Sequence, residues 1–279
     1  MEKLWNVISL GAGVQSSTMA LMASRNELCG INVDFAIFSD TQNESRKVYD
    51  WLDWLEKQLA FPVYRVTKGK LSEDALKVRN KKADDAPYIK NLLPVYTLSK
   101  TTGEPGFSNT RQCTIEYKVL PILREIKARC GVKRGQKYAT VTSLIGISYD
   151  EMQRMKFSRE KFVVNRWPLV ELKMTRQNCI DWMEVHGYPK PPRSSCVFCP
   201  FHSNSEWRRL QTQEPDEFKQ AVEFEKHLQQ QKNIEVNFEG IPFFHRSRKT
   251  LDKVDFRSDI EKGQQAFSFM DECEGMCGV

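Results

Sequence analysis

Short apolar runs and amphipathic stretches alternate along the first two thirds of this chain. Runs rich in β-branched and aromatic residues predict five strands, at Leu4–Leu10, Val33–Ser39, Pro62–Thr67, Tyr138–Ile147 and Phe162–Asn165. Between the second and third runs, residues 43–59 carry apolar side chains at helical spacing, which predicts an amphipathic helix. Such alternation indicates an α/β fold, with a doubly wound, mostly parallel five-stranded sheet and helices on both of its faces.

The alternation is interrupted in two places. Residues 71–106 combine a charged helical stretch with a turn at Thr101–Gly106, so we expect an insertion of about residues 71–107 that contains a hairpin. From about Tyr188 onward the chain carries several prolines, a Cys-x-x-Cys motif and a helical pattern at Glu214–Gln231. We therefore predict an α/β domain at 1–187 and a small C-terminal cysteine-containing lobe at 188–279.

The turn after the first predicted strand suits a phosphate group. Gly11, Ala12 and Gly13 allow the backbone to turn tightly, and the hydroxyls of Ser16 and Ser17 stand where the next helix is expected to start. The N–H groups and the positive dipole end of a helix N-terminus bind anions. The pattern therefore predicts a phosphate site.

The parallel sheet predicts where other ligand-binding residues lie. In such sheets ligands bind beyond the carboxyl ends of the strands, where the following loops converge. We therefore expect the loops at 11–17, 39–44 and 146–154 to meet at one place.

Composition places the protein in a broad class. A chain of 279 residues with 40% hydrophobic content buries a large core, and its net charge of +6 suits a polyanionic partner without establishing one. The first 30 residues lack the pattern of a secretory leader, and no stretch reaches the roughly 18 apolar residues of a membrane span. We therefore expect a cytoplasmic protein with no membrane partner.

Eight cysteines in a cytoplasmic chain favour metal binding or thiol chemistry over a disulfide framework. Cys196 and Cys199 form a Cys-x-x-Cys knuckle, Cys113 in a polar loop is the expected third ligand, and the tail offers Cys273 or Cys277 as a fourth. The remaining cysteines lie in or beside apolar helical patterns and are expected to be small buried hydrophobes: Cys29, Cys130 and Cys179.

A segment near residue 245 places aromatics beside a basic cluster. Phe243 and Phe244 precede four side chains that we predict to contact nucleic acid: His245, Arg246, Arg248 and Lys249. Aromatic rings stack on bases and basic groups hold phosphates. The alternative is a buried phenylalanine pair beside a solvated charged face.

Four motifs between about residues 4 and 200 resemble the PP-loop ATP pyrophosphatases of the adenine nucleotide alpha-hydrolase superfamily. The resemblance lies with the phosphoadenosine phosphosulfate (PAPS) reductase branch, which includes enzymes that thiolate DNA or tRNA. The family loop Ser-x-Ser-Gly-Gly-x-Asp-Ser-Thr is similar to residues 9–17, with Gly11 at a serine position and Gln15 at the aspartate position. Further similar motifs are Asp40-Thr41 with Glu44, Gly146 with Glu151 and Arg154, and Pro168-Leu169 with Glu171.

The resemblance implies an enzyme that binds ATP and Mg²⁺ at these motifs. The residues it assigns to the nucleotide are Ser9, Gly11, Ala12, Gly13, Gln15, Ser16, Ser17, Asp40, Thr41, Gly146, Glu151 and Arg154. Iron–sulfur members of the branch carry a cysteine before a Lys-x-x-Pro segment and a later Cys-x-x-Cys. The arrangement of Cys113 before Lys118 and Pro121 is similar, and it implies a 4Fe–4S cluster on Cys113, Cys196, Cys199 and Cys273, with Zn²⁺ as the alternative.

The leading functional expectation is an ATP-dependent sulfurtransferase that modifies nucleic acid and releases AMP and pyrophosphate. Its catalytic candidates are Ser16, Cys273 and Cys277, and a cysteine desulfurase is the kind of sulfur donor implied. One alternative is a PAPS or APS reductase, in which a C-terminal cysteine attacks the sulfate sulfur of a sulfonucleotide. Another is a non-catalytic nucleic-acid-binding protein stapled by zinc. A homodimer is compatible with each of them.

Overall fold

The computed structural model describes residues 3–28, 30–79, 88–232 and 234–257. These residues form two compact units. Unit 1 takes up the chain as far as Asp40, together with Glu44–Lys68 and Lys118–Ser194. Unit 2 takes up Thr41–Asn43, Gly69–Tyr117 and the described residues from Ser195 onward. In the part of the chain described, no helix combines the length and apolar character needed to cross a membrane.

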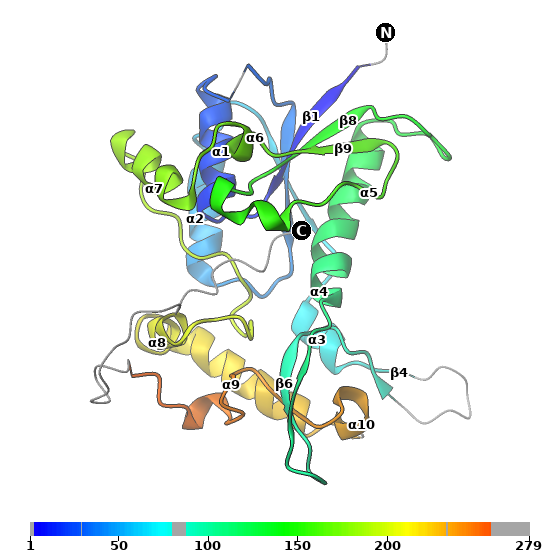
Figure 1. Ribbon diagram of the computed structural model, residues 1–279, viewed down its shortest axis with the longest axis vertical. Helices are drawn as coiled ribbons and strands as arrows, with labels where there is room; N and C mark the ends of the chain where they lie inside the picture. Colours follow the sequence, from blue (N-terminus) through cyan, green and yellow to red (C-terminus); the bar gives the residue numbers. More distant parts are fainter. Residues whose placement is uncertain (1–2, 29, 80–87, 233, 258–279) are drawn as a thin grey trace. The chain divides into compact units, whose positions relative to one another are not determined.

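A five-stranded parallel sheet forms the centre of unit 1 (Figure 1). Its strands are β1 (Trp5–Leu10), β2 (Phe35–Asp40), β3 (Val63–Thr67), β8 (Val141–Ile145) and β9 (Val163–Arg166). They lie in the order β3-β2-β1-β8-β9, and every neighbouring pair is parallel. The predicted α/β fold class is therefore confirmed, and all five predicted strands form with ends shifted by a few residues.

Helices cover both faces of this sheet. The helices of unit 1 are α1 (Val14–Ser24), α2 (Arg46–Glu56), α5 (Leu120–Arg129), α6 (Pro168–Glu171) and α7 (Arg176–Val185), with a 3₁₀ segment at Tyr149–Arg154. Because successive strand residues point to opposite faces, Ile8 packs in one cluster with α1, α2 and α7, whereas Val7 packs in a second with Ile126 of α5. Helix α1 is buried along almost its whole length.

The order of the strands defines where a ligand is expected to bind. From β1 the chain builds β2 and β3 on one side, and later returns to build β8 and β9 on the other. The reversal therefore lies between β1 and β8. In open α/β sheets, ligands bind beyond the carboxyl ends of the two strands at such a switch point. The segments that follow those two ends begin at Gly11 and Gly146.

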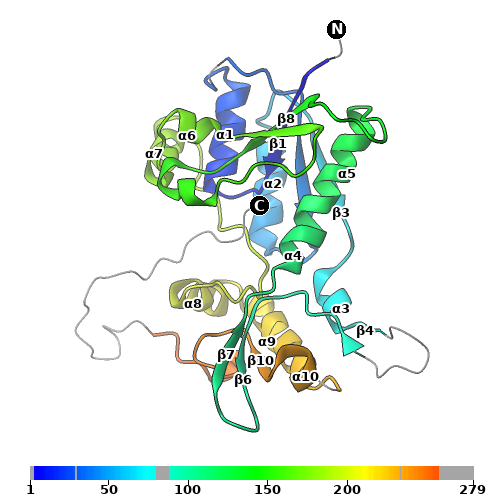
Figure 2. The same ribbon diagram turned by 45° about the vertical axis from the view of Figure 1, so that its right-hand side comes forward.

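Unit 2 combines small antiparallel sheets with helices (Figure 2). Its strands are β4 (Val78–Arg79), β5 (Tyr88–Ile89), β6 (Val95–Leu98), β7 (Pro105–Ser108) and β10 (Ile241–Phe243). Its helices are α3 (Leu71–Leu76), α4 (Gln112–Thr114), α8 (Asn204–Gln213), α9 (Pro215–Gln229), α10 (Ile234–Phe238) and the 3₁₀ turn η3 (Leu251–Lys253). The predicted hairpin is confirmed, because β6 and β7 pair in antiparallel register.

The insertion predicted at about residues 71–107 shares a core with the C-terminal lobe. Strand β10 pairs with β6, so that Phe243 lies opposite Tyr96. Unit 2 therefore joins residues 69–117 to the segment that starts at Ser195, whereas the sequence predicted one domain at 1–187 and a lobe from 188. Pairing between strands so distant along the chain leaves no trace in local periodicity, which explains the difference.

The chain from Gln112 to Arg129 is helical in three consecutive segments. Helix α4 is followed by a π-helical turn at Ile115–Val119, and α5 begins at Leu120 with Pro121 in its first turn. Proline lacks the N–H that a helix interior requires but is tolerated in a first turn. The change from π-helix to α-helix therefore lies directly before Pro121.

Candidate phosphate site and cysteine knuckle

Helix α1 begins with backbone N–H groups that the helix does not use. Its first residue is Val14, two positions before the predicted start, and the N-cap, Gly13, has no side chain that could accept a hydrogen bond from the first N–H groups of the helix. The first backbone hydrogen bond of the helix is donated by Ser17 N to Gly13 O, at 3.0 Å. The N–H groups of Val14, Gln15 and Ser16 therefore take no part in the backbone hydrogen bonds of the helix. The first turn carries no acidic residue. Such an N-terminus favours an anion.

The turn before α1 is closed by Ser16. Its hydroxyl accepts a hydrogen bond from Gly11 N at 3.2 Å and donates to Gly13 O at 3.3 Å. Between them, Ala12 adopts a φ of 56°, in the left-handed region that favours glycine. Ser16 therefore holds the shape of the loop, which makes it a positioning residue for a ligand at the N–H groups.

Gly146 brings the end of β8 against this loop. A Cβ atom on Gly146 would lie 2.7 Å from Ser16 Cα and 2.8 Å from Ser16 N. These contacts involve backbone atoms, so a side chain at this position has no room unless the backbone moves. The segment after β8 therefore meets the first turn of α1 through a contact that only glycine permits.

Gln15 joins the two loops through its side chain. Its amide nitrogen donates to Glu151 Oε2 at 3.2 Å and lies 3.5 Å from Ser148 Oγ, while its oxygen accepts from Arg176 Nη1 at 3.2 Å. Arg154 forms an ion pair with Glu151. Burial raises the pKa of Glu151, and the neighbouring Arg154 opposes that rise. A neutral amide at position 15 thus satisfies a donor and an acceptor at once.

Ser17, predicted to bind the nucleotide, lies in the core of unit 1. It is fully buried, and its hydroxyl accepts a hydrogen bond from Trp51 Nε1 of α2 at 3.0 Å. Ser17 therefore packs against α2 in the core of unit 1.

We expect the Ser17→Ala substitution to lower the free energy of unfolding by about 1–2 kcal/mol, because it leaves the buried indole N–H of Trp51 without an acceptor. Chemical denaturation followed by tryptophan fluorescence measures this change. A Ser24→Ala variant at the far end of α1, where the hydroxyl accepts from Ala60 N near the surface, is the matched control. An unchanged midpoint for Ser17→Ala would contradict the assignment.

The loop after β2 is divided between the two units. Asp40, at the end of β2, accepts a hydrogen bond from Tyr49 OH at 2.8 Å in unit 1. Thr41 belongs to unit 2, where its hydroxyl lies 3.2 Å from Cys196 Sγ. Glu44 is buried in unit 1 and pairs with Lys118 at 3.5 Å. Of the three loops predicted to meet, the structure brings together the first and third, at Gly11–Ser17 and Gly146–Arg154.

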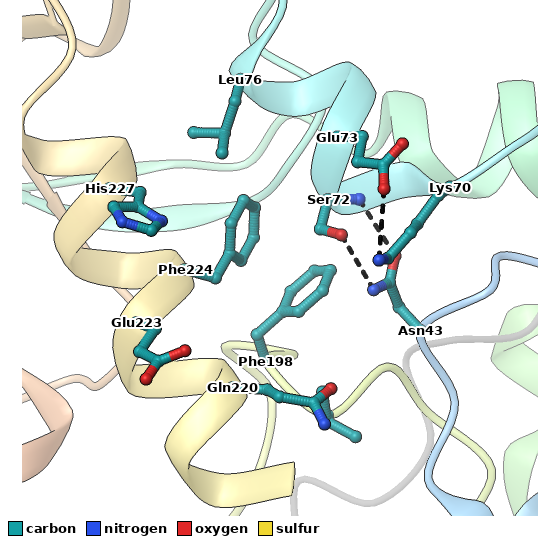
Figure 3. Close-up of a pocket in the computed structure, with 11 residues that line it drawn as sticks. Asn43, Lys70, Ser72, Glu73, Leu76, Phe198, Gln220, Glu223, Phe224 and His227 are labelled. Carbon is teal, nitrogen blue, oxygen red and sulfur yellow. Dashed lines mark hydrogen bonds and ion pairs between the residues drawn. The ribbon is translucent and has the colours of Figure 1, made fainter.

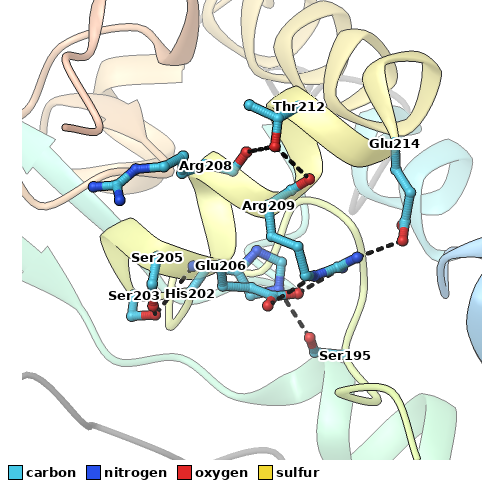
Figure 4. A network of polar contacts seen from close by, with 9 residues as sticks. All are labelled: Ser195, His202, Ser203, Ser205, Glu206, Arg208, Arg209, Thr212 and Glu214. Carbon is cyan, nitrogen blue, oxygen red and sulfur yellow. Dashed lines mark hydrogen bonds and ion pairs between the residues drawn. The ribbon is translucent and has the colours of Figure 1, made fainter. Parts of the chain in front are cut away.

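The Cys-x-x-Cys motif forms a tight turn in unit 2. Cys199 N donates to Cys196 O at 2.9 Å, and His202 N donates to Cys199 O at 3.1 Å. The ring of His202 hydrogen-bonds to Ser195 Oγ at 2.8 Å, and both residues are buried (Figure 4). This buried pair fixes the segment on either side of the two thiols.

Helix α8 follows the knuckle directly and is anchored by charge. The Ser203 hydroxyl accepts from Glu206 N at 3.2 Å and caps the helix, and Arg209 binds both Glu206, at 2.8 Å, and Glu214 (Figure 4). The helix cap and the ion pairs of α8 therefore fix the chain that follows Cys199.

The predicted ligand set is described only in part. Cys113 and Cys196 pack against the same apolar cluster of unit 2, and Cys199 is buried. Among the described residues, no three His, Cys, Asp or Glu side chains are placed to hold a metal ion. Cys273 and Cys277 lie outside the described residues, so the cluster and its fourth ligand stay predictions.

Of the three cysteines predicted to be buried hydrophobes, Cys179 is buried and Cys130 is half-buried. Cys179 is fully buried in the core of unit 1, and burial raises the pKa of its thiol to about 12. Burial likewise raises the pKa of the Cys130 thiol to about 11. Because the thiolate is the reactive form, neither is suited to nucleophilic chemistry. Cys29 lies outside the described residues.

A pocket of about 260 Å³ lies beside the knuckle in unit 2 (Figure 3). Phe198, between the two cysteines, and Phe224 of α9 form part of its apolar lining. On its polar side, Asn43 and Ser72 exchange two hydrogen bonds of 3.0 Å. Since Val197 N donates to Asn43 O at 2.8 Å, this wall is tied directly to the cysteine turn.

The basic segment after β10 divides into buried and exposed members. His245 is buried, and its ring nitrogens lie 2.9 Å from Asn204 Oδ1 and 2.8 Å from Ser247 Oγ. Arg248 donates to Thr97 O at 2.9 Å and to a second carbonyl of the hairpin. Arg246 and Lys249 are exposed. Of the four residues predicted to contact nucleic acid, two are therefore built into unit 2.

Two residues of the candidate phosphate site were not predicted from the sequence. Arg176 binds Gln15 from 161 positions along the chain, at the start of α7, and no local pattern links them. Ser148 lies inside the stretch Gly146–Arg154 that the sequence singled out, but its contact with Gln15 depends on the parallel pairing of β1 with β8. The signal for Ser148 was therefore present, whereas that for Arg176 was not.

No protein-family profile matches the chain, and no curated protein matches its sequence. Among solved structures, the chain is similar to a phosphoadenylyl-sulfate (PAPS) reductase from Candida auris, determined as a phosphate complex, with a TM-score of 0.40 and 16% identity. The match covers 68% of this chain and 76% of that one. The parallel sheet of unit 1 by itself defines the fold class.

Proposed function

We propose that this chain is a PP-loop ATP pyrophosphatase that activates nucleic acid for sulfur transfer by forming an adenylate. One observation carries the proposal: the uncapped N-terminus of α1 stands at the switch point of the parallel sheet, where Gly146 packs against Ser16. Backbone N–H groups at such a point suit the phosphates of a nucleotide. Arg154 and Arg176 add positive charge to the same network around Gln15.

The proposed reaction begins when an oxygen of the acceptor attacks the α-phosphorus of ATP. The bond from that phosphorus to the bridging oxygen breaks, and pyrophosphate leaves with the electron pair. The N–H groups of Val14, Gln15 and Ser16 would stabilise the negative charge that builds on the leaving group. Mg²⁺ is proposed to accompany ATP. A sulfur nucleophile then displaces AMP from the acceptor, since AMP is a far better leaving group than the original oxygen.

The cysteines of unit 2 are proposed to hold the sulfur-handling group. Thiolates suit a 4Fe–4S cluster or zinc, and the turn at Cys196–Cys199 presents two of them three residues apart. Cys113 and Cys273 are the further proposed ligands. A 4Fe–4S cluster would supply a site for sulfur delivery. The adenylation step is carried by the residues of unit 1.

Incubation with ATP labelled at the α-phosphate tests the proposal. Release of AMP, stimulated by nucleic acid, supports it, whereas thiol-dependent release of sulfite from PAPS would favour a sulfonucleotide reductase instead. Absence of both reactions in anaerobically purified protein would leave a binding protein.

We expect the Ser16→Ala substitution to lower ATP turnover about tenfold, because the hydrogen bonds that close the loop are lost and the N–H groups are less well ordered. The assay is the release of labelled AMP. Ser17→Ala is the matched control, since its hydroxyl faces Trp51 and should change stability without changing turnover of the folded protein. Equal turnover in the two variants would contradict a role for the loop.

A further inference from the structure

One face of the β10-β6-β7 sheet in unit 2 carries mainly apolar side chains, of which Pro105 and Phe107 are exposed and Tyr96, Leu98 and Ile241 are half-buried. Residues directly opposite in neighbouring strands share a face, so Tyr96 shares one with Phe107 and Phe243, and Leu98 with Pro105 and Ile241. The alternate residues Val95 and Thr97 point to the other side and are buried. An antiparallel sheet with one solvated face normally carries polar side chains there. On this face, which we name the hairpin face, the Tyr96 hydroxyl is the one polar side-chain group at these six positions, and Phe243 is buried.

Aromatic rings on the hairpin face continue into the cysteine segment. The rings of Tyr96 and Phe107 lie 4.9 Å apart between centroids, and Phe107 meets Phe201 edge-on at 6.1 Å. Phe107 is 42% exposed, and Tyr96 and Phe201 are half-buried. Phe201 stands two residues after Cys199. The row of rings therefore runs from the hairpin to the knuckle within one unit.

A guanidinium group lies at each end of this row. The Arg111 guanidinium lies 4.8 Å from the ring centre of Phe201, and that of Arg248 lies 5.9 Å from Tyr96. Arg248 is held in place by the carbonyls of Thr97 in β6 and Gly106 in β7. Cations that are fixed beside aromatic rings suit a ligand that has both flat faces and negative charge.

We infer that the hairpin face binds unpaired bases of a single-stranded nucleic acid, which stack on Tyr96, Phe107 and Phe201 while the phosphates contact Arg111 and the exposed Arg246 and Lys249. Rings stack only on bases whose faces are open, and duplex bases are already stacked on one another. The inference rests on the proposed function, in which nucleic acid is the substrate, and it names the state in which that substrate binds.

The charge of the molecule favours this occupant over a protein partner or a second copy of the chain. The net charge is +6, and positive side chains flank the rings of the hairpin face. A second copy would bring like charges together at the same rim, which opposes association. A polyanion is instead attracted to it.

Fluorescence anisotropy with the full-length protein tests the inference without ATP. The probes are a labelled oligodeoxythymidine of about 16 nucleotides and a duplex of equal length. We expect tighter binding of the single strand, and a loss of at least about fivefold in its affinity for the Phe107→Leu variant, which keeps an apolar side chain but removes the stacking ring. Phe107→Trp should retain binding. Phe157→Ala in unit 1, where the ring is 86% exposed, is the control and should bind as the wild type does.

Two outcomes would overturn the inference. One is equal affinity for duplex and single strand with no loss in Phe107→Leu. The other is failure to bind the oligonucleotide together with a dimer, seen by sedimentation, that Phe107→Leu dissociates; the face would then belong to a second copy. Because binding is measured without ATP, failure of ATP turnover would reject the adenylation step and leave this result standing.

Discussion

Replacing Gly146 with alanine is expected to lower ATP turnover by at least about 100-fold, because a misplacement of about 1 Å at a reacting site has effects of this size. The added Cβ would lie 2.7 Å from Ser16 Cα and 2.8 Å from Ser16 N, which are backbone atoms of the first turn of α1. Either β8 or the start of α1 must move, and both carry groups of the proposed phosphate site. Overpacking of this kind also costs about 1–3 kcal/mol of stability.

Gly11→Ala is the matched control, since it lies in the same loop and a Cβ there would meet only Ser16 Oγ, at an ordinary 3.6 Å. Turnover and thermal unfolding are measured for both variants. Gly146→Ala should unfold at lower temperature and lose turnover, and Gly11→Ala should keep both close to the wild type. If the two variants behave alike, the close approach of β8 to α1 has no part in activity.

The sequence predicted the architecture of unit 1 well because its signals are local. Each strand of the sheet is a short run with apolar residues on both faces, and the intervening helix α2 carries Val48, Leu52 and Leu55 on one buried side. The glycines at 11 and 13 and the serine at 16 likewise marked the loop correctly. The sequence did not predict the different contacts of the two serines. Ser16 closes the loop through Gly11 and Gly13, and Ser17 accepts a hydrogen bond from Trp51.

Unit 2 was harder to predict because long-range pairings assemble it. The β10-β6 pairing joins residues more than 140 positions apart, since Phe243 lies opposite Tyr96. Only that pairing shows that Tyr96, Phe107 and Phe243 share one face, and that Arg248 crosses the hairpin to bind Thr97 and Gly106. The predicted pairing of aromatic and basic residues near 245 was therefore close to the hairpin face, but it assigned Arg248 to the ligand without its structural contacts.

The Glu225→Gln variant is expected to remove a pH-dependent loss of stability from the loop that carries the basic segment. Glu225 in α9 is fully buried, and its two carboxylate oxygens accept hydrogen bonds from Phe244 N at 2.8 Å and Leu251 N at 2.7 Å. One carboxylate thus holds both ends of the segment 244–251. Burial raises the pKa of Glu225 to about 7, although the two backbone N–H groups oppose the rise. Asp252 raises it further, and Lys226 lowers it.

The sign of the effect follows from the raised pKa. The native protein binds the Glu225 proton more tightly than the unfolded chain, in which the pKa returns to 4.5. The stabilisation from this proton is complete below pH 4.5 and is lost as the pH rises through about 7. A difference of this size corresponds to about 3 kcal/mol. A glutamine does not titrate, so the wild type should lose about that much relative to Glu225→Gln between about pH 5 and about pH 8.

Hydrogen exchange of residues 244–251, followed by mass spectrometry and corrected for intrinsic rates, measures the loss at the loop itself. The wild-type segment should open more readily at the higher pH, and the segment in Glu225→Gln should show little change. Glu223→Gln is the matched control, because that side chain lies on the same helix and is 56% exposed. It should follow the wild type. If Glu225→Gln does so too, the ionisation of Glu225 does not govern the opening of this segment, and the basic loop is held by Arg248 and His245 instead.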